Sequence, residues 1–152
     1  MEEHTLEEIT DSILFHVEDV AFELTQTTSL TAWIQAVIES HAHQLRQLNY
    51  IFCSDTYLHK INIEYLNHDT YTDIITFPYQ HSPIVESDIF ISLDRVRENA
   101  QKFEVPFDME LRRVIIHGVL HLCGLADKTE AEKKQMRAME NTCLVLFDTE
   151  FA

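Results

Sequence analysis

Apolar residues follow helical spacing in some parts of the chain and extended spacing in others, which predicts a mixture of helices and strands. Trp33, Val37 and Leu48 lie near helical spacing and predict a helix over residues 29–47. Further helices are expected over residues 55–65, 94–103 and 129–147, and another from Asp108 through the histidine motif to a terminus at Gly124. Short β-branched and aromatic runs predict strands over residues 13–22, 50–53, 72–77 and 88–93. About four strands interleaved with helices indicate an α/β or α+β fold.

Polar capping residues and prolines give the expected boundaries of these elements. Asp55 and Asp108 are expected to cap helix starts, and Asp94 is expected to begin the helix that runs to about Phe103. Pro106 separates the last two helices of that set. Thr129 and Glu132 have the spacing of a capping box and predict the start of the final helix. The strands at 72–77 and 88–93 flank a short loop, which predicts a hairpin.

Length, charge and hydropathy exclude several classes of protein. At 152 residues the chain fits one domain with a proper hydrophobic core. The formal net charge is −15, which argues against indiscriminate nucleic-acid binding. All 11 basic residues lie between Arg46 and Arg137, so a local basic patch is compatible with the acidic flanks. No apolar run reaches the length of a membrane span, and the acidic N-terminus does not resemble a secretory signal.

The three cysteines indicate a reducing compartment. Cys53, Cys123 and Cys143 cannot all pair with one another, and their spacing is not that of a thiolate zinc site. We therefore expect buried free thiols and a cytoplasmic location.

Both glycines of the chain fall within one short histidine-containing stretch, although average usage would give roughly ten glycines in a protein of this length. His117 and His121 are four residues apart, so a helix places their rings on one face. Gly118 interrupts that helix at a cost of about 1 kcal/mol, which suggests that another backbone approaches closely there. Gly124 has the position of a left-handed helix terminus, and the following turn offers Asp127 a route back to the histidines.

Two imidazoles and a carboxylate form a donor set for a divalent metal ion that leaves one coordination position open. An open position is where hydrolytic chemistry takes place. The alternatives are a structural histidine pair and an aspartate that simply precedes the next helix cap. The spacing is similar to that of metzincin proteases, but Gly118 stands where zincins carry their glutamate base, so a peptidase is disfavoured. A phosphodiester substrate does not require that base.

Residues 117–127, His-Gly-Val-Leu-His-Leu-Cys-Gly-Leu-Ala-Asp, resemble the H-G-x-L-H-L-x-G-Y-D-H signature of the YbeY family of bacterial metal-dependent endoribonucleases and rRNA maturation factors. Residues 58–65, 72–78 and 87–92 resemble three further segments of that family in the same order. The resemblance runs from about Ile51 to Met139. It implies an α+β fold with a mixed four-stranded sheet, about five helices and a zincin-like metal helix, in a single domain over residues 1–152.

The resemblance also implies an activity and a ligand set. The activity is single-strand-specific RNA cleavage that acts in 3′-end maturation of 16S rRNA and in ribosome quality control. By position, His117 and His121 correspond to the first two zinc ligands, and Asp127 takes the place of a third histidine. The expected cofactor is one Zn²⁺ ion per chain, although a carboxylate ligand would also suit a harder divalent metal such as Mn²⁺. Ribosomal RNA and components of the small ribosomal subunit are the implied partners, with no membrane.

Two further departures from the family pattern are present, of which the first bears on activity and the second has local backbone consequences. Leu66 replaces the arginine that usually follows the 58–65 segment and is the expected phosphate contact, and Ser87 replaces a glycine. Five basic residues are candidates to supply the missing charge: Lys60, Arg95, Arg112, Arg113 and Lys128. The alternative functions are a zinc-stabilised ribosome-assembly factor that does not cut RNA and, less favoured, a degenerate metalloprotease.

Overall fold

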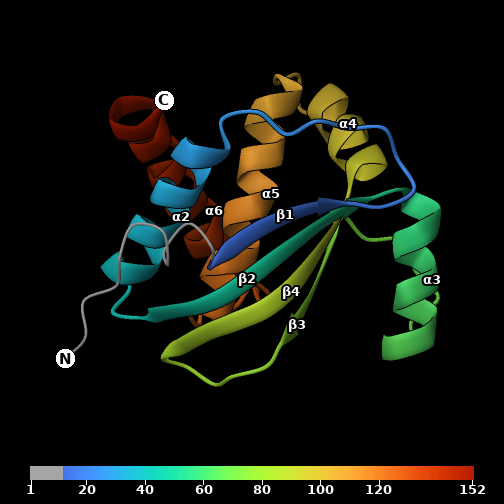
Figure 1. Cartoon of the computed structure of the whole chain (residues 1–152), viewed down its shortest axis with the longest axis horizontal. Helices are drawn as coiled ribbons and strands as arrows, with labels where there is room; N and C mark the ends of the chain where they lie inside the picture. Colours follow the sequence, from blue (N-terminus) through green and yellow to red (C-terminus); the bar gives the residue numbers. More distant parts are fainter. Residues whose placement is uncertain (1–11) are drawn as a thin grey trace.

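A mixed four-stranded sheet organises the molecule, which we describe from a computed structural model over residues 12–152 (Figure 1). The acidic N-terminus considered above as a signal sequence lies outside the described residues. The elements in chain order are β1 (Ile13–Val17), α2 (Thr27–Ser40), β2 (Gln44–Cys53), α3 (Asp55–Leu66), β3 (Ile74–Pro78), β4 (Ile84–Ser92), α4 (Leu93–Lys102), α5 (Phe107–Leu122), α6 (Glu130–Leu146) and the π-helical turn η1 (Phe147–Phe151). The expected α+β class, with four strands and five α-helices in the described part of the chain, is confirmed.

The sheet combines parallel and antiparallel pairs. Its strand order is β1-β2-β4-β3, in which β2 pairs in parallel with both β1 and β4. The edge strand β3 runs antiparallel to β4, with Thr76 opposite Ile89, and this pair is the predicted hairpin. The hairpin therefore places β3 beside α5, the helix that carries both histidines of the motif.

The two faces of the sheet are covered by different helices. Along β4, buried Ile89 and Ile91 face α2 and α5, whereas Phe90 points to the opposite face and packs near α3. This alternation is the expected two-residue period of a strand. Figure 1 shows α5 running along one face, while α3 lies apart beside the other. The larger apolar core thus lies between the sheet and the layer of α2, α5 and α6.

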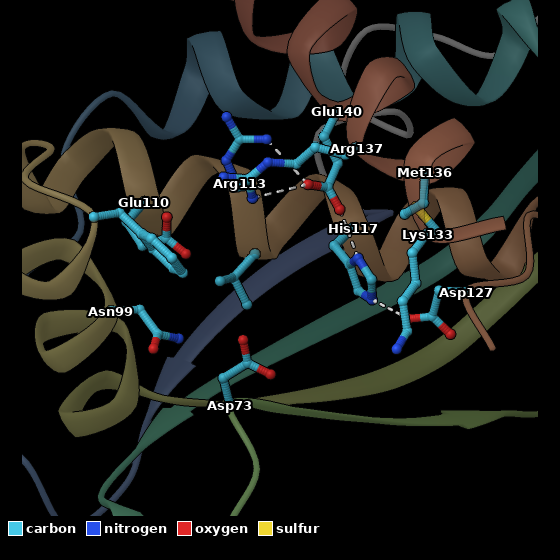
Figure 2. Close-up of a pocket in the computed structure, with 12 residues that line it drawn as sticks. Asp73, Asn99, Glu110, Arg113, His117, Asp127, Lys133, Met136, Arg137 and Glu140 are labelled. Carbon is cyan, nitrogen blue, oxygen red and sulfur yellow. Dashed lines mark hydrogen bonds and ion pairs between the residues drawn. The ribbon is translucent and has the colours of Figure 1, made fainter. Parts of the chain in front are cut away.

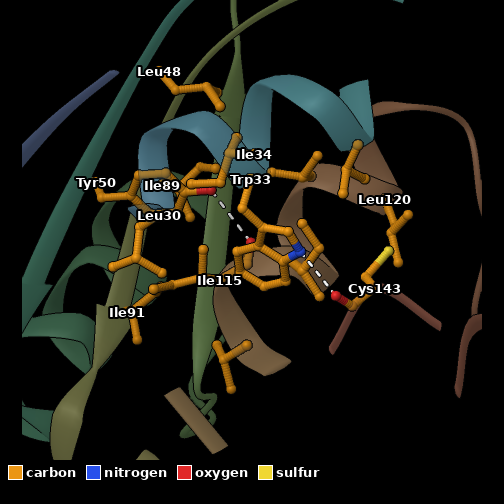
Figure 3. Close-up of a cluster of buried hydrophobic side chains, with 14 of the residues drawn as sticks. Leu30, Trp33, Ile34, Leu48, Tyr50, Ile89, Ile91, Ile115, Leu120 and Cys143 are labelled. Atoms are coloured by element: carbon orange, nitrogen blue, oxygen red, sulfur yellow. Dashed lines mark hydrogen bonds between the residues drawn. The ribbon is translucent and has the colours of Figure 1, made fainter. Parts of the chain in front are cut away.

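Trp33 anchors the C-terminal helix in this core (Figure 3). The fully buried indole Nε1 donates a hydrogen bond of 2.8 Å to the Cys143 carbonyl, and the ring packs edge-on against Phe147 at 5.1 Å. These contacts fix α6 against α2. The three cysteines are buried and free, as expected from their number and spacing.

The helix predicted over residues 29–47 extends too far along the chain; in the structure it is α2. It ends at Ser40, and Leu48 belongs to β2 rather than to the helix. Ala42 adopts a φ of 57°, which turns the chain out of the helix before the strand begins. Pairing of β2 with two neighbouring strands fixes the extended conformation of residues that taken alone have helical spacing.

The expected aspartate caps were also wrong in detail. Ser54 and Ser92 are the residues whose hydroxyls cap α3 and α4, and Asp55 and Asp94 follow in the first turn. Asp108 likewise lies within the first turn of α5 and forms no side-chain cap. Carboxylates in the first turn interact favourably with the helix dipole. The aspartates therefore indicated correctly where each helix starts, although they lie inside the first turn and do not cap it.

None of the helices formed by residues 12–152 combines the length and the apolar character that crossing a lipid bilayer requires.

Candidate functional site

Helix α5 brings the motif to the sheet through Gly118. A Cβ built at this position would lie 2.9 Å from Ile74 Cδ1 on β3 and 3.6 Å from two Ile89 atoms on β4. Glycine therefore allows α5 to lie closer to the sheet than a larger residue would permit. The sequence predicted a neighbouring backbone here, but the close neighbours are isoleucine side chains.

The Ile74 contact predicts how the fold responds to a side chain at position 118. Gly118→Ala should change the free energy of unfolding by less than about 1 kcal/mol, because the gain in helix propensity offsets the clash with Ile74 Cδ1. Ile74→Val removes that atom, so in this background Gly118→Ala should stabilise by up to about 1 kcal/mol. Urea denaturation of the four proteins measures both differences. If Gly118→Ala destabilised equally in both backgrounds, the side chain of Ile74 would not be the limiting neighbour.

The turn after α5 returns Asp127 to the first histidine. Gly124 adopts a φ of +101° at the helix end, as the sequence predicted. Thr129 and Glu132 then form the expected capping box at the start of α6. Asp127 Oδ2 lies 3.3 Å from His117 Nε2, and Figure 2 shows the two side chains facing one another. The structure thus brings together two of the three predicted ligands.

A buried carboxylate from α6 orients His117. The imidazole Nδ1 donates a 2.7 Å hydrogen bond to Oε2 of Glu140, whose residue is only 5% exposed. The other oxygen, Oε1, accepts a 3.0 Å hydrogen bond from Arg113 Nη1. The hydrogen bond that His117 donates to Glu140 raises the pKa of His117, although burial acts in the opposite direction. Glu140 therefore fixes the imidazole ring and directs its Nε2 toward Asp127.

His117 and Asp127 open onto a cavity of about 340 Å³ between α4, α5 and α6 (Figure 2). Its further lining includes Asp73, Asn99, Phe103, Glu110, Lys133 and Arg137. Burial is the main cause that raises the pKa of both Asp73 and Glu110.

The side chains of His117, His121 and Asp127 are chemically suited to bind a divalent metal ion. The three side chains do not, however, converge on one point. In residues 12–152 no group of three or more His, Cys, Asp or Glu side chains is arranged as a metal site. His121 is exposed one turn beyond His117. The fit rests on His117, because a histidine that donates Nδ1–H to a buried carboxylate presents Nε2 as a metal ligand. Zinc ligation thus stays a prediction for His117, His121 and Asp127.

Three of the five candidate phosphate contacts lie away from this cavity. Lys60 lines a separate groove between α3 and the β3–β4 hairpin. Arg95 holds Asp55 through two hydrogen bonds of 3.0 and 3.2 Å. The guanidinium of Arg112 lies over the Phe147 ring at 4.7 Å. Arg95 and Arg112 therefore have structural partners elsewhere, and Lys60 faces a different groove.

The other two candidates lie close to the motif. Arg113 lines the cavity, but it is bound to Glu140 and donates a 2.8 Å hydrogen bond to Asn141 Oδ1. Lys128 is exposed in the turn next to Asp127. Leu66, which replaces the family arginine, lines a different hollow beside β3.

The sequence reasoning missed the contribution of α6. Lys133, Met136, Arg137 and Glu140 all line the cavity. Their spacing of three and four residues is that of one helix face, so the pattern was visible in the sequence. The spacing alone does not indicate a function, because only the fold shows that this face of α6 lies opposite His117.

Comparison with known proteins matches almost the whole described chain to one family. Residues 12–148 match the sequence profile of the family described as Endoribonuclease YbeY. A protein named Endoribonuclease YbeY from Flavobacterium psychrophilum is 50% identical over 129 residues, which cover 85% of this chain and 92% of the relative. A protein of the same name from Flavobacterium johnsoniae is 47% identical over 132 residues, with 87% and 95% of the two chains covered.

The fold has a counterpart among solved structures. The solution structure of TM1509 from Thermotoga maritima superposes with a TM-score of 0.66 at 24% identity, and covers 89% of this chain and 88% of that one. At this level of identity the likeness supports the fold alone.

Proposed function

The chain belongs to the YbeY family of endoribonucleases, and from this premise we propose that it is a metal-dependent nuclease that cleaves single-stranded RNA. The observation that carries the proposal is the Glu140–His117–Asp127 arrangement on the wall of a cavity. We further propose that it acts in the cytoplasm, in 3′-end maturation of 16S rRNA and in ribosome quality control, with rRNA and small-subunit components as partners.

His117, His121 and Asp127 would hold the metal ion, with Zn²⁺ as the first candidate. When bound there, a divalent cation supplies Lewis acidity toward a phosphodiester. Glu140 keeps the His117 ring in one orientation and one tautomer. Asp127 contributes a negative charge where the family has a neutral histidine, so the site should accept harder divalent metals more readily.

Besides the metal ion, the reaction requires positive charge near the phosphate, and the basic side chains of α6 supply it. Cleavage adds negative charge at the phosphate, and nearby cations stabilise that charge. Lys133 and Arg137 line the cavity and so offer a replacement for the family arginine whose position is occupied by Leu66.

The same leucine favours a second candidate function, a metal-stabilised ribosome-assembly factor that binds rRNA without cutting it. A protein of this kind would keep the fold, the cavity and the ligand set but would lack a cation placed for the transition state.

An RNA cleavage assay separates the two functions. Purified protein supplied with Zn²⁺ or Mn²⁺ should cleave an unstructured RNA oligonucleotide and leave the same sequence intact when it is paired in a duplex. A chelator should abolish cleavage, and re-addition of the metal should restore it. Binding of the oligonucleotide without metal-dependent products would support the assembly factor and overturn the nuclease.

A further inference from the structure

An exposed aromatic ring surrounded by basic side chains lies at the rim of the cavity. Phe103, the C-cap residue of α4, is 47% exposed and lines the same cavity as His117. Lys102 Nζ lies 5.6 Å from the centroid of its ring, and Arg137 Cζ lies 5.7 Å from it. The ring and its two cations therefore come from α4 and α6, the two helices that flank the site.

The cations at this rim are only weakly held by other groups. Arg137 is half exposed, and its nearest carboxylate oxygen is Glu140 Oε1 at 3.9 Å, which already accepts the shorter bond from Arg113. Lys133 is similarly exposed and lies 3.7 Å from Glu130, itself a solvated side chain. Exposed pairs of this kind contribute about 0–1 kcal/mol, so exchanging the carboxylate for a phosphate costs little.

This rim differs from the exposed aromatic groove beside α3. The groove beside α3 includes Tyr65 and Phe77, but Lys60 is its single basic residue and Glu64 and Asp88 lie beside it. Among the described residues, no basic side chain lies over the Tyr65 or Phe77 ring. The Phe103 rim joins an exposed ring to basic side chains from two helices and to the cavity of His117.

We propose that Phe103 is a stacking platform for one unpaired base of the RNA strand, and that Lys133 and Arg137 contact the phosphates beside it. Single-stranded nucleic acids are bound in this way, by aromatic faces that stack bases and by cations that follow the backbone. A base inside a duplex has no free face to offer, so the platform would select unpaired RNA. The proposal rests on the proposed nuclease function, because it assigns the substrate contacts of that same cavity.

Binding measurements on a ring variant test the platform. The probe is a labelled oligouridylate of about 12 nucleotides, titrated in the presence of a chelator so that cleavage does not interfere. Phe103→Leu should raise Kd about tenfold or more, whereas Phe103→Tyr should stay within about twofold of wild type, because only the former removes the π-face. Tyr65→Leu is the matched control, since this ring is 69% exposed and lies in the other groove. Melting curves verify that every variant is folded.

The salt dependence of binding tests the phosphate contacts. Lys133→Gln and Arg137→Gln should each reduce the slope of log Kd against log salt by about 0.7, the value for one phosphate on a single strand. Arg97→Gln should leave the slope unchanged, because this α4 arginine lies over Phe107, away from the cavity.

The outcomes for the platform and for the nuclease are distinguishable. Equal affinity of wild type and Phe103→Leu for the oligouridylate would overturn the platform, even if the wild type cleaved RNA. Phe103-dependent binding by a wild type that never cleaves RNA would support the platform and overturn the nuclease.

Discussion

His117→Ala should reduce the rate of RNA cleavage by about a thousandfold or more, the scale of loss when the core of a catalytic unit is removed. His117 is the group that joins the buried Glu140 to Asp127, through contacts of 2.7 and 3.3 Å. Its loss leaves a carboxylate on each side with no imidazole between them. Cleavage of a labelled single-stranded RNA at saturating enzyme measures the rate of the chemical step.

Two controls make this result specific. His16→Ala removes an exposed histidine from β1, at the opposite edge of the sheet, and should cleave RNA like wild type. Elemental analysis of the purified proteins should show bound metal in wild type and His16→Ala and little or none in His117→Ala. Full cleavage by His117→Ala would assign the activity to a contaminating nuclease and remove the proposed function.

Glu140→Ala should lower the free energy of unfolding by about 3–5 kcal/mol, which is the usual cost of leaving a buried charge without its partner. The carboxylate is shared by Arg113 and His117, and Arg113 is itself largely buried. Chemical denaturation of the metal-free protein measures the loss. Glu130→Ala, at the exposed start of the same helix, should cost less than about 1 kcal/mol.

The stability lost in Glu140→Ala should depend on pH, and the protonation of His117 sets the direction of this dependence. Its pKa in the folded protein is raised above the ordinary value of 6.5, so the Glu140–His117 contribution is fully present below that value. It disappears as the pH rises through the raised pKa, and the deficit of Glu140→Ala should shrink accordingly. Arg113→Met in the Glu140→Ala background should recover part of the stability, because the unpaired charge is then gone. A deficit below 1 kcal/mol at every pH would show that Glu140 is not a structural partner of either residue.

The elements predicted with most success were those whose signals are local. The capping box at Thr129 and the left-handed glycine at Gly124 depend on a few neighbouring residues, and both were placed correctly. The boundary between α2 and β2 was misplaced because it is set by strand pairing with β1 and β4. That pairing involves residues far away in the chain, and the spacing around Leu48 does not reveal it.

The same distinction applies to the site. His117 and Asp127 lie within one helix and its following turn, so their spacing alone predicted that they would meet. Glu140 and Arg113 come from two helices, and their pairing is a property of how α6 packs on α5. The basic residues chosen from the sequence were selected by charge, whereas Lys133 and Arg137 line the cavity because of the face they occupy on α6.

The position of α6 in the chain has a consequence for biosynthesis. A ribosome assembling this polypeptide incorporates His117, His121 and Asp127 before it reaches Glu140 and the Cys143 carbonyl that receives the indole of Trp33. Nascent chains therefore contain the ligand residues for a period in which Glu140 does not yet hold the first imidazole in place. On the proposed function, the nascent enzyme would acquire its cutting ability only after α6 has been synthesised and has packed against α5.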